Sequence, residues 1–349
     1  MVVDLIPSLQ TVDPDQFDRL DSSGGAVACY HRTRQRERDG RWKVQYVRAT
    51  DGDRLLAVVP LYTFRSAAWA DPAYDSMAWP LPAGSTETNT PGSCLLVGGN
   101  ADLRSGLHVD RALQDETGFR PVLAAAAHAA ATEGRGLIFP YLYGAARDLL
   151  DRATGGRIAW APLGQEAQFP HALADDSEER CSSQVRRVLR RDRNLIAEQQ
   201  VATAVWTWSE VEDEAAEVIA QHNIRKGKPD HPEFVRMRYA QWDDCPSVEL
   251  TVFTARAGGV EGVTTALRWQ DQLEVYEIAL TGEDSPERLA VYVSLLFHQP
   301  ARFGMEHGLR NLRGGLDAMT PKAMRGAVFK ELYGGVLNAA ATREVVNGR

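Results

Sequence analysis

The fold is decided by the stretch VELTVF (248–253) and the two stretches that follow it, VTTALRW (263–269) and LEVYEIAL (273–280). Apolar and polar residues largely alternate in them, as in strands that bury one face. The pair Gly258-Gly259 separates the first two stretches and supplies residues suited to a tight turn between antiparallel strands. The sequence therefore predicts a three-stranded antiparallel meander.

A similar pattern occurs near the N-terminus. The stretches VQYVRA (44–49) and LLAVVPLY (55–62) flank Asp51-Gly52-Asp53, and Asp-Gly is a pair that tight hairpin turns favour. We interpret the two patterns as an internal duplication, the alternative being two unrelated hairpins.

Each predicted hairpin or meander is followed by helices and another strand. In the first copy an Ala-rich helix begins near Pro121 and precedes the apolar run 137–139. In the second, helices over 286–298 and 301–306 precede a strand at 311–316. Antiparallel strands interleaved with helices predict α/β domains, each a mainly antiparallel mixed sheet flanked by helices. A chain of 349 residues accommodates two such domains, which we place at 1–160 and 161–349.

Composition indicates a soluble globular protein. Hydrophobic residues make up 44% and charged residues 25% of the chain, and the sequence offers neither a signal peptide nor an apolar run long enough to span a bilayer. We therefore expect a cytoplasmic protein without membrane insertion. The cysteines Cys29, Cys94, Cys181 and Cys245 are scattered, so neither a disulfide framework nor a metal site is indicated. The net charge of −8 disfavours affinity for polyanions over the whole surface but allows a local basic patch.

Such a patch is predicted on a helix over residues 178–199. The segment opens with acidic residues and then turns basic, which suits the helix dipole. Helical spacing leaves an arginine-rich face opposite an apolar one, with Arg186, Arg187, Arg190, Arg191 and Arg193 largely on it. Guanidinium groups grip phosphate bidentately, although the face could equally be solvated. A second basic cluster includes Arg225 and Lys226.

The C-terminal segment GGLDAMTPKAMRGA (314–327) carries a family resemblance. A strand that ends in Gly and leads to a Lys and then to Arg-Gly resembles the terminal pattern of FemAB-like acyltransferases. The stretch SSQVRRVLRR (182–191) is similar to the arginine-rich helix that many of them carry before their second domain. The resemblance covers roughly residues 175–335, and the N-terminal half mainly through the repeat. It implies two tandem GNAT-like domains.

The resemblance also implies an activity, the transfer of an aminoacyl group from aminoacyl-tRNA onto an amine. Lys322 is then the candidate for stabilising the developing oxyanion or a tRNA phosphate, and Arg325 for holding phosphate or the loop. Without the resemblance, both would be surface residues beside a turn. An attacking amine must also lose a proton, and the candidate bases are Asp317, Glu277 and His298. The last two could equally be a sheet-edge charge and a core imidazole.

The choice of donor depends on a difference between this chain and coenzyme A acetyltransferases. In coenzyme A acetyltransferases a glycine-rich turn cradles pyrophosphate, whereas this chain has TGEDSP (281–286) at that place, and its two acids would repel pyrophosphate. We therefore favour an aminoacyl-tRNA co-substrate, with no bound cofactor, over acyl-CoA. The alternatives are an acyl-CoA-dependent N-acyltransferase and a non-catalytic module that binds a precursor.

The acceptor is expected to be a small amine or hydroxylamine. The long helical arm of bridge-forming FemAB-like enzymes is missing from the sequence, which resembles the shorter transferases, some of them in specialised-metabolite pathways. The segment 74–90 is predicted to be a loop that could border the acceptor pocket.

Overall fold

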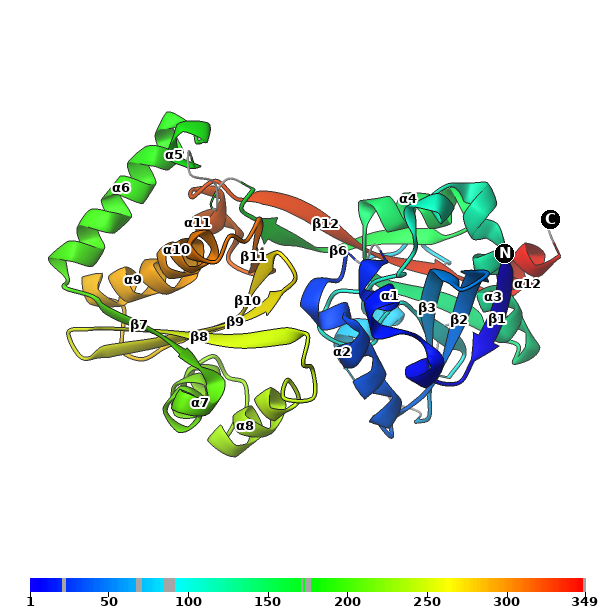
Figure 1. The fold of residues 1–349 in the computed structure, drawn as a ribbon, viewed down its shortest axis with the longest axis horizontal. Coiled ribbons are helices and arrows are strands. Elements are labelled where there is room, and N and C mark those ends of the chain that lie inside the picture. The colour runs from blue at the N-terminus through cyan, green and yellow to red at the C-terminus, as the bar shows by residue number, and fades with distance from the viewer. Residues whose placement is uncertain (21–22, 67–70, 85–91, 171, 173–176, 348–349) are drawn as a thin grey trace. The chain divides into compact units, whose positions relative to one another are not determined.

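A computed structural model of the chain describes residues 1–20, 23–66, 71–84, 92–170, 172 and 177–347. The chain forms two compact units (Figure 1). Unit 1 comprises Met1–Gly164 together with Glu331–Arg349, and unit 2 comprises Gln165–Lys330. The sequence analysis placed the division at residue 160 and assigned the whole C-terminal part to the second domain. The structure instead returns the last stretch of chain to unit 1.

Unit 1 is built on a mixed sheet in the order β1-β2-β3-β4-β5-β12. Its strands are β1 (Val2–Ile6), β2 (Trp42–Asp51), β3 (Arg54–Phe64), β4 (Cys94–Val97), β5 (Gly136–Tyr143) and the part of β12 (Val328–Leu337) that belongs to this unit. Its α-helices are α1 (Pro14–Arg19), α2 (Tyr30–Gln35), α3 (Glu116–Thr132), α4 (Gly144–Ala153) and α12 (Ala339–Val346). Short 3-10 turns are η1 (Leu9–Thr11), η2 (Gly25–Ala28), η3 (Arg36–Arg38), η4 (Pro72–Tyr74), η5 (Ser76–Ala78) and η6 (Arg111–Leu113). Strands β4 and β5 are parallel, and the other pairs named for this sheet are antiparallel.

Alternation along β2 and β3 buries both faces of this sheet. Val47 and Val59 belong to the larger core, which includes residues of α3 and α4, whereas Tyr46 and Val58 pack with the residues around α1 and α2. Helix α3 begins at Glu116, capped by the Asp115 carboxylate, so Pro121 lies inside the helix rather than at its start. The Asp115 cap accepts from the main chain of Gly118, which fixes the helix start before Pro121 is reached.

Unit 2 has the sheet order β6-β11-β10-β9-β8-β7. Its strands are the end of β6 (Ala159–Gln168), β7 (Ala202–Thr207), β8 (Val248–Ala257), β9 (Val260–Trp269), β10 (Gln272–Leu280) and β11 (Asn311–Gly315). Its helices are α5 (Ser177–Arg180), α6 (Ser183–Glu198), α7 (Trp208–Arg225), α8 (Pro232–Ala240), α9 (Pro286–Val293), the π-helical turn η7 (Ser294–His298), α10 (Gln299–Glu306) and α11 (Met319–Ala323). The predicted basic helix is thus two helices, α5 and α6, because Ser182 caps the start of α6.

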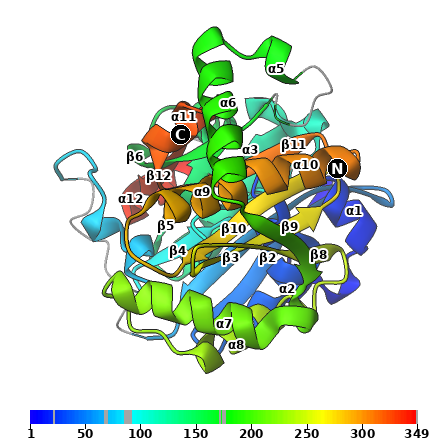
Figure 2. The ribbon, with the colours of Figure 1, turned by 90° about the vertical axis from the view of Figure 1, so that its left-hand side faces the viewer.

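Helices cover both faces of the unit 2 sheet (Figures 1 and 2). On the face that we call the α7 side, His222 of α7 lies 3.2 Å from the Leu280 carbonyl and Tyr239 of α8 reaches Thr265. On the opposite face, the α9 side, a Cβ at Gly262 would lie 2.6 Å from Leu295 and 2.7 Å from Val291. Gly262 therefore lets α9 and η7 approach the sheet closely.

The two units repeat one topology, as the duplicated pattern predicts. In unit 1 an antiparallel run of strands ends in β4. Helix α3 follows, and the next strand, β5, pairs with β4 in parallel. In unit 2 the meander ends in β10. Helices α9 and α10 follow, and the next strand, β11, pairs with β10 in parallel. Each sheet is then extended by a strand that follows the other copy: β12, after α11, pairs with β5, and β6, after α4, pairs with β11. This exchange explains why the last stretch of chain belongs to unit 1.

Across the described ranges, none of the helices has the length and hydropathy that crossing a bilayer requires. In the same ranges, Cys29, Cys94 and Cys245 are buried and Cys181 is partly exposed. No group of three or more metal-ligating side chains occurs among the described residues.

Candidate functional site

The parallel pairing of β10 and β11 begins at Gln272 with Asn311 and reaches Glu274 with Arg313. We call the end of this pairing the fork of unit 2. In open sheets, the point where neighbouring strands separate is a common place for a site, because side chains there have space on one side. The fork therefore marks where to look for polar groups.

A β-bulge places two glutamates of β10 on one face of the sheet. Glu274 lies opposite Leu267 and Val275 opposite Ala266, but the next pair is Glu277 with Thr265, so that Tyr276 is the extra residue. Strict alternation would turn Glu277 away from Glu274. With the bulge both point to the α7 side, as the contacts of Glu277 with α7 and α8 confirm.

A buried charge cluster sits at the fork. The Arg313 guanidinium donates two hydrogen bonds of 3.0 Å to the Glu166 carboxylate and a third of 3.3 Å to Glu274. Gln168 donates to the same Glu166 carboxylate at 3.0 Å. All three charged side chains are nearly inaccessible to solvent, with exposed fractions of 6% or less. Buried ions persist only when paired and hydrogen-bonded, so this cluster is organised around Arg313.

Glu277 lies in a second network on the same side. It accepts hydrogen bonds from the Tyr239 hydroxyl at 2.7 Å and from the Asn223 amide at 3.2 Å, and Arg238 approaches it at 3.5 Å. Asn223 and Arg238 also donate to Asp230. The Glu277 side chain keeps 23% of its exposure, so it is held in place and still reaches solvent.

Lys322 is buried, contrary to the alternative of a surface lysine. Its ammonium donates to the main-chain oxygen of Asp317, while the Asp317 residue itself is exposed. Burial lowers the pKa of Lys322 to about 8, and the negative charges of Asp317 and Glu166 oppose that shift. Glu166 of the fork cluster is thus one of the two charges that favour the protonated form of Lys322.

Arg325 and His298 come together elsewhere, around Asp192 of α6. Arg325 donates to both carboxylate oxygens of Asp192, at 2.6 and 2.9 Å, and lies over the Phe297 ring at 4.5 Å. His298 Nε2 is 3.8 Å from the same carboxylate. Burial acts to raise the pKa of Asp192, but His298 and Arg325 outweigh it and lower the pKa below its ordinary value. Arg325 is thus largely committed to Asp192, and the expectation that it holds phosphate is not supported by its contacts.

The basic residues predicted to meet phosphate are placed in different ways. Arg187, Arg190 and Arg191 are exposed on α6, and none of them pairs with a carboxylate in the part of the chain that the structure describes. Arg186 donates to the Cys181 carbonyl at 2.6 Å.

The second basic cluster lies at the end of α7. Arg225 donates to the carbonyls of Leu280 and Gly282 at the end of β10, which occupies its guanidinium, whereas Lys226 is exposed. The predicted loop of the first half begins with the buried Tyr74, and its residues 85–90 lie outside the described residues.

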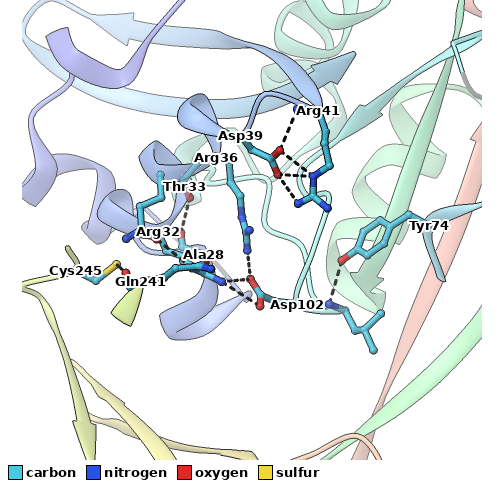
Figure 3. A network of polar contacts seen from close by, with 12 residues as sticks. Ala28, Arg32, Thr33, Arg36, Asp39, Arg41, Tyr74, Asp102, Gln241 and Cys245 are labelled. Carbon is cyan, nitrogen blue, oxygen red and sulfur yellow. Dashed lines mark hydrogen bonds and ion pairs between the residues drawn. The ribbon is translucent and has the colours of Figure 1, made fainter. Parts of the chain in front are cut away.

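Unit 1 carries a polar network of its own (Figure 3). Arg32 and Arg36 of the α2–η3 segment both contact the Asp102 carboxylate, and the Tyr74 hydroxyl accepts from the main chain of Leu103 at 3.0 Å. Asp102 and Leu103 have φ angles of 64° and 50°, unusual for residues other than glycine. The network fixes the loop after β4.

Comparison with known proteins identifies solved structures that share the fold. Neither a protein-family model nor a curated protein matches the sequence. Among solved structures, FemX aligns with a TM-score of 0.64 at 9% identity, over 96% of this chain and 97% of that one. L-PGS from Bacillus licheniformis aligns with a TM-score of 0.55 at 13% identity, over 97% and 98%. A tandem GNAT protein from the clavulanic acid biosynthesis pathway aligns at 0.51 and 13%, over 97% and 99%.

The chain has the tandem GNAT fold. The likeness covers both units, so the predicted fold class of two GNAT-like domains is confirmed. Identities this low establish the fold alone, and the function must be argued from the site.

The sequence analysis missed most partners in these networks. Glu166, Glu274 and Arg313 occupy ordinary polar positions of alternating strands, where a buried charge looks the same as a solvated one. Tyr239, Asn223 and Asp230 lie far from Glu277 in sequence. The one available signal was the arginine in the short strand at 311–315, since arginine is rarely buried without a partner.

Proposed function

We propose that the protein is an aminoacyltransferase that moves an aminoacyl group from aminoacyl-tRNA onto a small amine or hydroxylamine. The observation that carries the proposal is the burial of the Lys322 ammonium, whose pKa is lowered by that burial and feels the charge of Glu166 in the fork cluster. The FemAB-like resemblance of the segment around Lys322 and the shared fold with FemX and L-PGS support it.

In the proposed reaction the acceptor nitrogen attacks the ester carbonyl of the donor. The new C–N bond forms, the C–O bond to the ribose breaks, the nitrogen loses a proton and the ribose oxygen gains one. With a pKa of about 8, Lys322 is largely protonated at neutral pH and can stabilise negative charge on the carbonyl oxygen. A preorganised charge in a site shielded from water is worth more than one in water.

Glu277 is our choice for the group that receives the proton from nitrogen. It is the candidate that the bulge turns to the side of Glu274, and Tyr239 and Asn223 fix its carboxylate while part of it stays open to solvent. Asp317 is exposed, with its carbonyl engaged by Lys322, and remains the second candidate. His298 faces Asp192 and has no part in the proposal.

The donor is proposed to dock on the exposed arginines of α6. Arg187, Arg190 and Arg191 lie three and four residues apart, and their guanidinium groups are available to successive phosphates of an acceptor stem. An acyl-CoA donor is the second candidate, favoured by the fold that this chain shares with the tandem GNAT protein. The acidic segment after β10 argues against pyrophosphate at that place.

The test measures loss of label from radiolabelled total aminoacyl-tRNA in the presence of a panel of small amines. We expect acceptor-dependent deacylation by the wild type and a decrease on the order of 10²-fold or more in Lys322→Met, since removal of one oxyanion-stabilising donor commonly has that effect. The matched control is Lys330→Met, an exposed lysine on β12. Lys322→Arg keeps the charge and should extend activity above pH 8, where Lys322 loses its proton.

Three results would contradict the proposal. Deacylation that is equal in Lys322→Met and Lys330→Met would remove Lys322 from the reaction. Consumption of acyl-CoA instead of aminoacyl-tRNA would establish the second candidate. Binding of acceptor without turnover of either donor would identify a non-catalytic module.

A further inference from the structure

The Arg325 guanidinium is held by contacts with three separate segments of unit 2. Its Nε and Nη2 donate to the two carboxylate oxygens of Asp192, at 2.6 and 2.9 Å. Its Nη1 donates to the Pro321 carbonyl at 2.9 Å, and the group lies over the Phe297 ring at 4.5 Å. A guanidinium presents its donors in a rigid planar fork, so these contacts together fix its position and its orientation.

Arg325 also holds the main chain on both sides of Lys322. The carbonyl of Pro321, which precedes Lys322, accepts from the Arg325 guanidinium. The carbonyl of Lys322 itself accepts from the main-chain N–H of Arg325 at 3.0 Å and of Ala327 at 3.1 Å. Both peptide groups that flank the Lys322 Cα are therefore hydrogen-bonded, and the direction in which its side chain leaves the main chain is fixed.

The Lys322 side chain needs such support because its ammonium is buried. The residue is 3% exposed, and the ammonium donates to the Asp317 carbonyl. Burial of an ammonium is unfavourable, and a lysine side chain is long and flexible enough to carry its charge back to water. The turn around Lys322 must therefore be anchored by contacts other than those of Lys322 itself.

Helix α6 supplies this anchor. Asp192 is buried on α6, with 2% of its side chain exposed, and it provides the counter-charge for Arg325, whose side chain is 5% exposed. Gly326 follows with a φ of 87°, and a Cβ there would lie 3.4 Å from Val185 of α6. The turn thus packs directly on the helix whose exposed arginines are proposed to dock the donor.

We propose that Arg325, held in place by Asp192, is a positioning residue that keeps the Lys322 ammonium buried beside the Asp317 carbonyl. Its part in transfer rests on the function proposed for Lys322 above. Arg325 then acts through Lys322 and through its own main chain, with its guanidinium bound to a carboxylate. Because Arg325 and Asp192 carry opposite charges but share this role, positioning can be distinguished from a direct effect of charge on Lys322.

The pKa of Lys322, followed by NMR of protein labelled with ¹³C,¹⁵N-lysine, tests the proposal without any substrate. The method suits this chain because it has only five lysines, Lys43, Lys226, Lys228, Lys322 and Lys330. The signal of Lys322 is the one lost in Lys322→Arg, and in the wild type we expect its pKa to be about 8. Arg325→Met and Asp192→Asn should each raise this pKa by about one pH unit or more, because a loosened turn lets water reach the ammonium.

The two variants act in opposite directions if charge alone matters. Loss of the Arg325 cation would raise the pKa of Lys322, whereas loss of the Asp192 anion would lower it. Asp192→Asn keeps the shape of the side chain and carries less risk to folding, which near-UV circular dichroism checks in each variant. Arg302→Met, which removes an exposed cation beside Glu306, should leave the pKa unchanged. An unchanged pKa in both Arg325→Met and Asp192→Asn, or shifts of opposite sign, would overturn the proposal.

Transfer assays with the same variants separate this inference from the proposed function. In Asp192→Asn the rate at pH 7 should fall about tenfold or more, because the ammonium is no longer held in place. The pH above which the rate falls, about 8 in the wild type, should rise together with the pKa of Lys322. A protein without transfer activity whose Lys322 pKa still rises in both variants would contradict the proposed function and support the positioning role. Transfer with the same pH profile in the wild type and both variants would show that Arg325 and Asp192 do not act through Lys322.

Discussion

The fork of unit 2 has a counterpart in unit 1, at the end of the parallel pairing of β4 with β5, and the two forks share a topology and differ in chemistry. In unit 1 every residue of β4 and β5 is buried, and the pairing of Leu95 with Leu137 and of Leu96 with Ile138 makes the fork apolar. In unit 2 the corresponding pairing of Glu274 with Arg313 joins charged residues. A duplicated fold thus keeps the same strand order while one copy uses the fork for packing and the other uses it to hold charge.

The difference extends to the segments around each fork. Unit 1 places its polar network in the loop after β4, where Asp102 joins Arg32 and Arg36, outside the paired residues of the strands. Unit 2 places its network within the strands, and the charge of Glu166 in that network acts on the pKa of Lys322. Chemistry at the fork is therefore expected to depend on unit 2, with unit 1 contributing stability, and this expectation can be tested by substitution in each copy.

The largest effect is expected from Arg313→Met in unit 2. Removing the guanidinium leaves Glu166 and Glu274 buried without their cation, which typically costs about 3–5 kcal/mol of unfolding free energy. Urea denaturation measures the loss. Adding Glu166→Gln and Glu274→Gln removes the uncompensated charges and should recover a large part of it. A single variant as stable as the wild type would show that the cluster does not organise the fork.

A smaller loss, with a different functional outcome, is expected from Leu95→Ala in unit 1. Leu95 is fully buried in the core that β4 shares with α3, and truncation of a buried leucine costs roughly 2–5 kcal/mol. Transfer activity per folded molecule should be unchanged at a temperature where the variant remains folded. Loss of activity as great as in Lys322→Met would refute the division of roles between the forks.

Sequence reasoning located both strands of the unit 2 fork and part of β5 in unit 1, but it did not predict β4 and could not assign the chemistry of either fork. Alternation is enough to predict β8–β10, because it depends on which face is buried. The bulge at Tyr276 depends on the pairing with β9 and is invisible in the sequence of β10. The ion pair of Arg325 with Asp192 joins residues far apart in the chain, so a conspicuous arginine near a family-like motif was expected to hold phosphate or the loop, and the carboxylate that it contacts could not be foreseen.

The sequence also did not predict how deeply individual polar side chains are buried. The exposed face of α6 follows from helical spacing, whereas Lys322, in an equally polar segment, is buried and donates to the main-chain oxygen of Asp317. Local pattern predicts periodicity well, and the depth at which a polar residue lies is set by tertiary contacts.

The smallest effect is expected in the loop after β4 of unit 1, where a buried histidine should make the stability of the protein depend on pH. His108 is buried against Phe17 at a ring distance of 4.2 Å, and burial lowers its pKa to about 3. Because this folded-state pKa lies below the unfolded value of 6.5, its contribution to stability is complete above pH 6.5 and is lost as the pH falls toward 3. Between pH 7 and pH 5 the loss amounts to roughly 2 kcal/mol.

Urea denaturation at both pH values isolates this contribution. His108→Asn removes the titrating group with a residue that tolerates the left-handed backbone at this position, where φ is 47°, and should reduce the difference between the two pH values by about that amount. His128→Gln, on the exposed side of α3, should leave the difference unchanged. If the wild type and His108→Asn lose equal stability on acidification, the acid sensitivity resides in groups other than this histidine, and the unit 1 loop contributes packing alone.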